Sequence, residues 1–320
     1  MLETVSLIAV CSLAAVFVLL MVAAYVAYRY TFYVSKKQKH PDPYRVVREG
    51  DPMADTRKQL ADGILAQSFT DVTVTSRDGL SLHGRIKIVS EGAPFAIMCH
   101  GYRSTPLIDF SGGAILAMNL GYNVLLIDQR AHGDSEGKNL TFGVKESRDA
   151  IDWANFVKKS YGSDSILFGI SMGAATVLMS AGLPELPECV KGVFADCPFS
   201  TAKDIITKEI KHRGMPFPKL AYELARLGAR LYGDFDPNAA RPIDSVKNAK
   251  VPIVLVHGES DTFVPHEMSY AIHIAGNVPL HSFKDAAHGT SYLFEPERYG
   301  RIVKEFCSAC IPENKNEKEI

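Results

Sequence analysis

The stretch SILFGISMG, residues 165–173, decides how this chain folds. Its first part, residues 165–169, is a short apolar run of the kind found in strands that are buried on both faces. Its second part is a G-x-S-x-G motif centred on Ser171, where a helix is expected to begin. Glycines two residues to either side permit a tight turn that lifts the serine hydroxyl above the sheet. The stretch therefore predicts an α/β fold with Ser171 as candidate nucleophile; the alternative is a small-residue turn that only packs a helix onto a sheet.

Similar strands are predicted on both sides of this stretch. They are expected at 96–99, 123–128, 190–196, 251–257 and 279–283, with helical stretches between most of them. Continuous apolar runs, rather than strict alternation, predict a mostly parallel sheet with helices on both faces. Upstream, residues 68–89 alternate around the turn dipeptide Asp78-Gly79, which predicts two paired strands.

The pattern changes between Cys197 and Lys250. Two helical pieces, 202–212 and 220–231, follow one another there, joined by a segment rich in glycine and proline. An insertion at this point lies above the carboxyl ends of the strands, where α/β sheets bind ligands. We therefore expect a small helical cap over the site.

A serine becomes a good nucleophile when a base takes its proton and a third group orients that base. Asp261 follows the predicted strand 251–257, and His288 follows the predicted strand 279–283. Both residues are thus expected in loops on the same sheet edge as Ser171, in the chain order serine, acid, histidine that this kind of fold uses. We predict that the three form a catalytic triad.

Each role in this triad has rival residues. Asp196 also ends a predicted strand and is an alternative acid. His281 lies within the last strand, where a packing or surface position is expected, and His257 is expected to brace the acid loop by a hydrogen bond. His100 and His132 precede the serine in sequence and are weaker candidates for the base.

Two backbone N–H groups are expected to stabilise the negative charge that develops on a substrate carbonyl oxygen. One belongs to Met172, directly after the nucleophile. The other is expected in the loop His100-Gly101-Tyr102, at Tyr102. The Tyr102 ring either borders the pocket or packs at the surface.

The N-terminal stretch 5–27 contains about 23 residues without a charge, enough to cross the hydrocarbon core of a bilayer. Tyrosines gather at its end, where an interface favours aromatic rings, and a basic group follows at Arg29 and Lys36 to Lys39. A cleaved signal peptide is the alternative, but its basic residues would precede the apolar run. We expect a single-pass anchor in the cell membrane with the body on the cytoplasmic side.

Composition excludes some classes of protein. The 320 residues carry a formal net charge of -1, so no dense cationic face for nucleic acid is expected. The 6 cysteines sit in apolar surroundings or, at Cys307 and Cys310, on a predicted helix, so no disulfide framework is expected. Phosphate-loop, zinc-protease and dinucleotide motifs are incomplete, and we expect no metal and no organic cofactor.

The segments HGYRST, DQRAHGDSEGK, GISMGAAT, ADCPFS, HGESDTFVP and AAHG together resemble the α/β-hydrolase family, in particular its bacterial membrane-anchored serine hydrolases. The resemblance covers about residues 68 to 310. It implies esterase-type chemistry with Ser171, Asp261 and His288 as triad and Tyr102 and Met172 at the oxyanion hole. The loop from Asp128 to Ser135 also matches the family, where its role is most often structural.

The expected organisation is an anchor at 1–35, a connector at 36–67, a hydrolase domain at 68–312 with its cap at 197–250, and a charged tail at 313–320. The expected activity is cleavage of a carboxylic ester of a small acyl substrate through an acyl-enzyme, and membrane tethering points to an amphiphilic substrate. A thioesterase, acyltransferase or peptidase with the same triad is the alternative within enzymes, and a membrane-tethered binding protein is the alternative outside them. The oligomeric state stays open.

Overall fold

The computed structural model describes residues 2–312; the predicted charged tail, 313–320, lies outside this range. The strands are β1 (Thr70–Thr75), β2 (Ser81–Lys87), β3 (Phe95–Cys99), β4 (Asn123–Ile127), β5 (Ser165–Ile170), β6 (Val190–Asp196), β7 (Ile253–Gly258) and β8 (Leu280–Phe283). The α-helices are α1 (Leu2–Thr31), α2 (Lys36–Lys39), α3 (Ala54–Leu65), α4 (Pro106–Asp109), α5 (Ser111–Asn119), α6 (Glu146–Tyr161), α7 (Met172–Ala181), α8 (Ala202–His212), α9 (Pro218–Tyr232), α10 (Pro242–Ser245), α11 (His266–Gly276), α12 (Ser291–Phe294) and α13 (Pro296–Cys310), with 3-10 turns η1 (Pro237–Ala239) and η2 (Val246–Asn248).

The strands form one sheet in the order β1-β2-β4-β3-β5-β6-β7-β8. Neighbours from β4 to β8 pair in parallel, whereas β2 runs antiparallel to both β1 and β4. The turn between β1 and β2 contains Gly79 with a φ of 86°, a conformation that glycine adopts without strain. The predicted fold class, an α/β sheet of mostly parallel strands, is confirmed.

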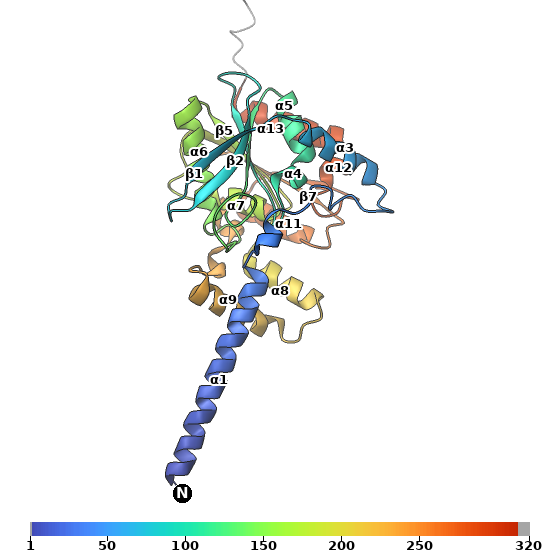
Figure 1. The fold of residues 1–320 in the computed structure, drawn as a ribbon. Coiled ribbons are helices and arrows are strands. Elements are labelled where there is room, and N and C mark those ends of the chain that lie inside the picture. The colour runs from blue at the N-terminus through green and yellow to red at the C-terminus, as the bar shows by residue number, and fades with distance from the viewer. Residues whose placement is uncertain (1, 313–320) are drawn as a thin grey trace, which may run out of the picture.

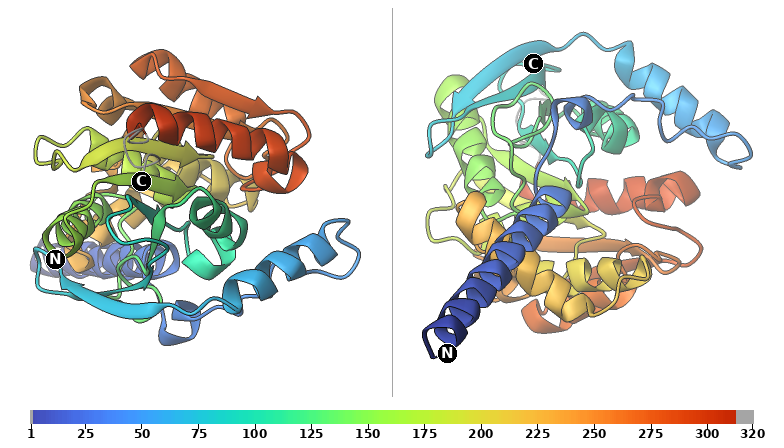
Figure 2. Two further views of the ribbon diagram at one scale, coloured as in Figure 1. Left: turned by 90° about the horizontal axis from the view of Figure 1, so that it is seen from above. Right: turned by 60° about the horizontal axis from the view of Figure 1, so that its bottom comes forward.

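Helices cover both faces of the sheet (Figure 2). Along β3, Phe95, Ile97 and Cys99 face the cluster that contains α6, α7 and α11, while Ala96 and Met98 face the cluster that contains α3, α5 and α13. Successive side chains of a strand point to opposite faces, so a strand covered on both sides must be apolar throughout. This explains the continuous apolar runs in the sequence.

The region predicted as a cap has two parts. α10 and η2 pack on α7 and α11 beside the sheet. In contrast, α8 packs on α9, and α9 packs on the last turns of α1, away from the sheet (Figure 1). A third apolar cluster joins these elements to α7 and includes Tyr28, Phe32 and Val34, which are all buried.

The N-terminal helix α1 extends far beyond the body of the molecule (Figure 1). By length and composition, Thr4–Thr31 is able to cross a membrane. Its first part is exposed in the chain taken alone, while its last turns lie beside α9. Gly228 of α9 permits this contact because it has no side chain: a Cβ there would lie 2.2 Å from the carbonyl oxygen of Ala24.

Candidate active site

Ser171 occupies the turn between β5 and α7 with φ 57° and ψ -115°. This conformation is strained for a residue with a side chain, by roughly 1–3 kcal/mol. The surrounding structure holds it, since the Ser171 N–H donates to the carbonyl of Asp196 at 2.8 Å. The serine side chain is thereby fixed at the start of a helix, at the carboxyl edge of the sheet.

The two glycines of the motif are required by close backbone contacts. A Cβ at Gly169 would lie 2.2 Å from the carbonyl oxygen of Gly173, across the turn. A Cβ at Gly173 would lie 1.8 Å from the carbonyl oxygen of Cys99, at the end of β3. Both distances are far inside van der Waals contact, so the turn tolerates no side chain at either position.

The structure brings together the three residues predicted for the triad. His288, in the loop after β8, places Nε2 2.9 Å from Ser171 Oγ and Nδ1 2.6 Å from Asp261 Oδ2. Asp261 lies in the loop after β7. A carboxylate at Nδ1 favours the tautomer with its proton on Nδ1, which leaves Nε2 to accept a proton from the serine.

The Asp261 carboxylate is held on every side. Its Oδ1 accepts hydrogen bonds from the backbone N–H groups of Phe263 and Val264 at 2.9 and 2.8 Å. Its Oδ2 also contacts His257 Nε2 at 3.1 Å. Burial opposes ionisation of this carboxyl, but the hydrogen bonds from His257 and His288 outweigh it, and the pKa of Asp261 lies below its usual range. Asp261 is therefore an anion under ordinary conditions.

The alternative acid, Asp196, makes no hydrogen bond with His288. Its Oδ2 accepts a hydrogen bond from the Tyr299 hydroxyl at 3.0 Å, and its Oδ1 has no hydrogen-bond partner among residues 2–312. Burial raises the pKa of Asp196 to about 6. His257, as expected, braces the acid loop: besides Asp261 it contacts Ser269 Oγ at 2.6 Å. His281 lies within β8, half-buried.

The two early histidines are structural in their contacts. His100 and His132 are fully buried, and burial lowers the pKa of each to about 4. His100 Nε2 accepts from the Gln129 N–H at 3.1 Å, and His132 Nε2 accepts from the Arg103 N–H at 3.2 Å. Both neutral rings thus hold the backbone of the loop after β3.

That loop lies directly against the nucleophile. A Cβ at Gly101 would lie 3.3 Å from Ser171 Cβ, so the backbone next to Tyr102 borders the serine. Neither the Tyr102 N–H nor the Met172 N–H donates a hydrogen bond within the part of the chain that the structure describes. Two unused donors beside Ser171 are the arrangement that an oxyanion requires.

The sequence interpretation missed how this loop is attached to α1. The Tyr102 hydroxyl donates to the Thr31 carbonyl at 2.9 Å. The Arg103 guanidinium donates to the carbonyls of Tyr30 and Tyr33 at 2.8 and 3.1 Å. A cation suits the carbonyl end of a helix. The sequence predicts interfacial positions for the tyrosines around position 30, and nothing in it pairs them with Tyr102.

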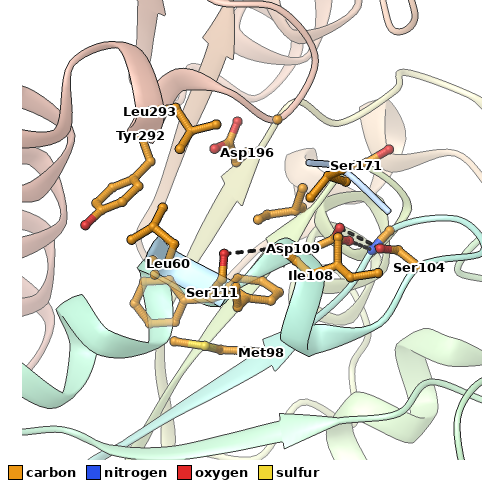
Figure 3. A pocket seen from close by; sticks show the side chains of 18 of the residues that line it. Leu60, Met98, Ser104, Ile108, Asp109, Ser111, Ser171, Asp196, Tyr292 and Leu293 are labelled. Carbon is orange, nitrogen blue, oxygen red and sulfur yellow. Dashed lines mark hydrogen bonds between the residues drawn. The ribbon is translucent and has the colours of Figure 1, made fainter. Parts of the chain in front are cut away.

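Two cavities of different character meet at Ser171, and Tyr102 and Phe263 border both. The smaller, about 280 Å³, contains polar side chains on the sheet side. Figure 3 shows Asp196 in it, with Ser104 and Asp109 joined by a hydrogen bond on another part of its wall. The larger, about 940 Å³, lies toward α1, α8 and α9 and is lined mostly by apolar side chains, with Glu209 and Arg213 as charged exceptions.

In two groups of described side chains, the potential ligand atoms lie close enough to one another to bind a single metal ion. One consists of Cys197, Asp261 and His288, but burial holds the pKa of the Cys197 thiol well above its usual value, and a thiol must ionise to bind metal. The other consists of His83, Asp128 and Asp134, where the Arg85 guanidinium already contacts both carboxylates at 3.4 and 3.3 Å. Neither group fits a metal site.

Comparison with known proteins agrees with this fold. The model of the alpha/beta hydrolase family matches residues 96–302. The chain is 26% identical over 219 residues to the uncharacterised Bacillus subtilis protein YqkD, covering 66% of this chain and 70% of that one. It is 28% identical over 141 residues to the thiohydrolase aneE of Aspergillus aculeatus, covering 42% of this chain and 43% of that one. An esterase structure from Pyrococcus furiosus is similar with TM-score 0.63 and 25% identity, covering 79% of this chain and 93% of that one.

Proposed function

Because this chain belongs to the alpha/beta hydrolase family, we propose that it is a serine hydrolase that cleaves a carboxylic ester through an acyl-enzyme. The observation that carries this proposal is the line of hydrogen bonds from Ser171 through His288 to Asp261 at the carboxyl edge of the sheet. The similarity to an esterase structure supports a hydrolase. The ester as substrate and the serine as nucleophile are our inference from the site.

In the first step, Ser171 Oγ bonds to the substrate carbonyl carbon while its proton passes to His288 Nε2. The carbonyl oxygen becomes an oxyanion, which the N–H groups of Tyr102 and Met172 stabilise. Asp261, an anion with a lowered pKa, stabilises the imidazolium that forms. The intermediate then expels the alcohol, which takes the proton from Nε2.

In the second step, water attacks the acyl-serine ester. His288 Nε2 removes a proton from this water, and the same two amides stabilise the second oxyanion. Collapse breaks the bond between the acyl carbon and Ser171 Oγ, and the serine recovers its proton from the imidazolium. The products are a carboxylic acid and the free enzyme.

We also propose that α1 stays attached and anchors the body at a membrane. Arg29, Lys36, Lys37 and Lys39 follow the apolar stretch, which favours a body on the cytoplasmic side. Sequencing of the N-terminus of purified chain tests attachment: a chain that begins after residue 27 would show a signal peptide instead. Protease protection of inside-out and right-side-out vesicles tests the side.

The triad is tested with the full chain in detergent, using p-nitrophenyl butyrate and a fluorophosphonate label. Ser171→Ala is expected to lose label and to lower kcat by about 10⁵- to 10⁶-fold. Ser245→Ala is the control, because the Ser245 hydroxyl bonds the carbonyl of Arg241 away from the site. Equal activity in the wild type and Ser171→Ala would contradict the proposal, and a wild type that takes no label would favour a binding protein.

A thioester is the second candidate substrate, because the chain is similar to a thiohydrolase. Comparing kcat/KM for palmitoyl-coenzyme A and p-nitrophenyl palmitate separates the two. A thioesterase would favour the coenzyme A ester by orders of magnitude, whereas the proposed esterase would not. Addition of glycerol as acceptor, with ester products measured, detects an acyltransferase.

A further inference from the structure

The larger cavity connects Ser171 with the surface of the membrane helix. Ser171 and Met172 line it, and most of its other wall residues are apolar side chains of three helices, with Glu209 and Arg213 of the region after Cys197 as charged exceptions. α1 contributes Val22 and Val26, and α8 and α9 contribute Ile210 and Leu224. Such a long apolar space, open next to a nucleophile, suits a hydrocarbon chain rather than a polar substrate.

α1 supplies one complete wall of this cavity. The wall residues of α1 recur every three or four positions from Leu19 to Thr31, which places them on one face of the helix. At about 1.5 Å per residue, this face runs for about 18 Å along the cavity. An extended acyl group of long chain length matches such a groove.

The wall is packed, not loosely tethered. α1 and α9 approach closely at Ala24 and Gly228, and the Tyr25 and Tyr232 rings meet edge to face at 5.2 Å. The Tyr28 hydroxyl contacts the Tyr232 carbonyl at 3.2 Å. These contacts hold the cavity-lining part of α1 against α9.

The bilayer must reach the cavity if α1 spans it. The apolar stretch before the cavity wall, residues 5–18, is about 14 residues or about 21 Å long, which is less than the roughly 30 Å of hydrocarbon. The rest of a membrane span must therefore come from the part of α1 after residue 18, which lines the cavity and lies beside the cap. Around the cap, Phe217 and Leu220 expose 75% and 59% of their surface, as expected of side chains that enter lipid.

We propose that this cavity binds the acyl chain of a lipid ester that enters sideways from the bilayer, with α1 as a wall of the substrate site. The proposal rests on the proposed function, since Ser171 must attack the ester at the inner end of the chain. The alcohol part then occupies the smaller cavity, whose lining includes the polar side chains of Ser104, Asp109 and Ser111. The substrate class is therefore membrane lipids with a long acyl chain and a polar alcohol part.

Two valines of α1 provide a matched test in nanodiscs. Val26 and Val18 expose 59% and 58% of their surface in the chain alone, but only Val26 lines the cavity. Val26→Trp is expected to lower kcat/KM for p-nitrophenyl palmitate by about tenfold or more and to leave p-nitrophenyl acetate within about twofold. Val18→Trp is expected to leave both within about twofold. An unchanged palmitate rate in Val26→Trp, or an equal fall for both esters, would overturn the inference.

A binding experiment separates this inference from the proposed function. The full Ser171→Ala chain is placed in phosphatidylcholine nanodiscs with a lysophospholipid whose palmitoyl chain ends in a diazirine. Crosslinks are expected at Val22, Val26 and Leu224, and Val26→Trp is expected to remove them. Crosslinks only at the outer face, such as Val18, or only in the smaller cavity, such as Leu60, would refute the inference whether or not the wild type cleaves esters.

Discussion

The two sides of Ser171 are built differently. On the sheet side, Asp261 and His288 come from strand-end loops and are fixed by buried and partly buried hydrogen bonds. On the membrane side, α1, α8 and α9 meet through apolar and aromatic contacts, and α1 lies outside the stretch that matches the family. The part of the chain that matches the family thus packs against a helix that lies outside the match. Substitutions on one side of Ser171 are therefore expected to have different kinetic effects from substitutions on the other side.

The largest expected effect concerns the two carboxyls near the site. Asp261→Asn is expected to lower kcat by about 10³- to 10⁴-fold, because an amide favours the wrong tautomer of His288 and does not stabilise the imidazolium. Asp196→Asn is the matched change, and it should lower kcat for p-nitrophenyl butyrate by less than about tenfold, because Asp196 does not contact His288. Kinetics of both variants in detergent measure this difference. Equal losses of kcat in the two variants would show that Asp261 and Asp196 do not differ in their contribution to catalysis.

A smaller effect is expected where α1 meets α9. Gly228→Val introduces side-chain atoms where a Cβ already lies 2.2 Å from the Ala24 carbonyl, so the two helices must separate. The rate with p-nitrophenyl palmitate should fall by about tenfold while that with the acetate changes by less than about threefold. Arg230→Val, an exposed position on the same helix, is the control. A uniform loss for both esters would mean that the membrane side also positions the triad.

The fold and the meeting of three side chains were predictable because both follow from local patterns. Apolar runs mark strands buried on both faces, and residues just after parallel strands converge on one edge. Ser171, Asp261 and His288 each follow such a run, so the structure could bring them together as expected.

The attachment of α1 was not predictable in the same way. An apolar helix of this length indicates a membrane span, and nothing in its pattern shows that one face borders a cavity. The contact depends on Gly228 in a distant helix, and a single glycine has many other uses. The tie between Tyr102 and Thr31 involves a backbone carbonyl, which every residue carries. Only a three-dimensional structure reveals such pairs.

Stability should depend on pH through Asp196, on the sheet side. Burial raises the pKa of Asp196 to about 6 in the folded chain, above its value in the unfolded chain. The folded state therefore keeps this proton up to a higher pH than the unfolded state does. As pH rises from about 4 to about 6, the contribution of Asp196 to the free energy of unfolding falls by about 2–3 kcal/mol at most. Asp196→Asn should raise the thermal midpoint relative to wild type more at about pH 7 than at about pH 4. A constant difference across that window would show that Asp196 does not titrate there.

The smallest effect is expected at the link between the two sides. Tyr102→Phe removes the hydroxyl that donates to the Thr31 carbonyl and keeps the ring. One hydrogen bond contributes about 0.5–1.5 kcal/mol, so kcat for p-nitrophenyl butyrate should fall by about two- to tenfold. Phe142→Leu, which alters a ring packed 5.5 Å from Tyr102 and leaves this hydrogen bond, is the comparison. An unchanged kcat in Tyr102→Phe would show that the link does not position the loop.

That link has a mechanical consequence. A helix that crosses a bilayer tilts to match the thickness of the surrounding lipid. The last carbonyls of α1 accept hydrogen bonds from Tyr102 and Arg103, in the loop whose backbone borders Ser171. If α1 crosses a bilayer, as we propose, a change of its tilt would be passed on to the loop that carries the Tyr102 amide. The thickness of the membrane would then be one of the variables that set the position of this amide beside Ser171.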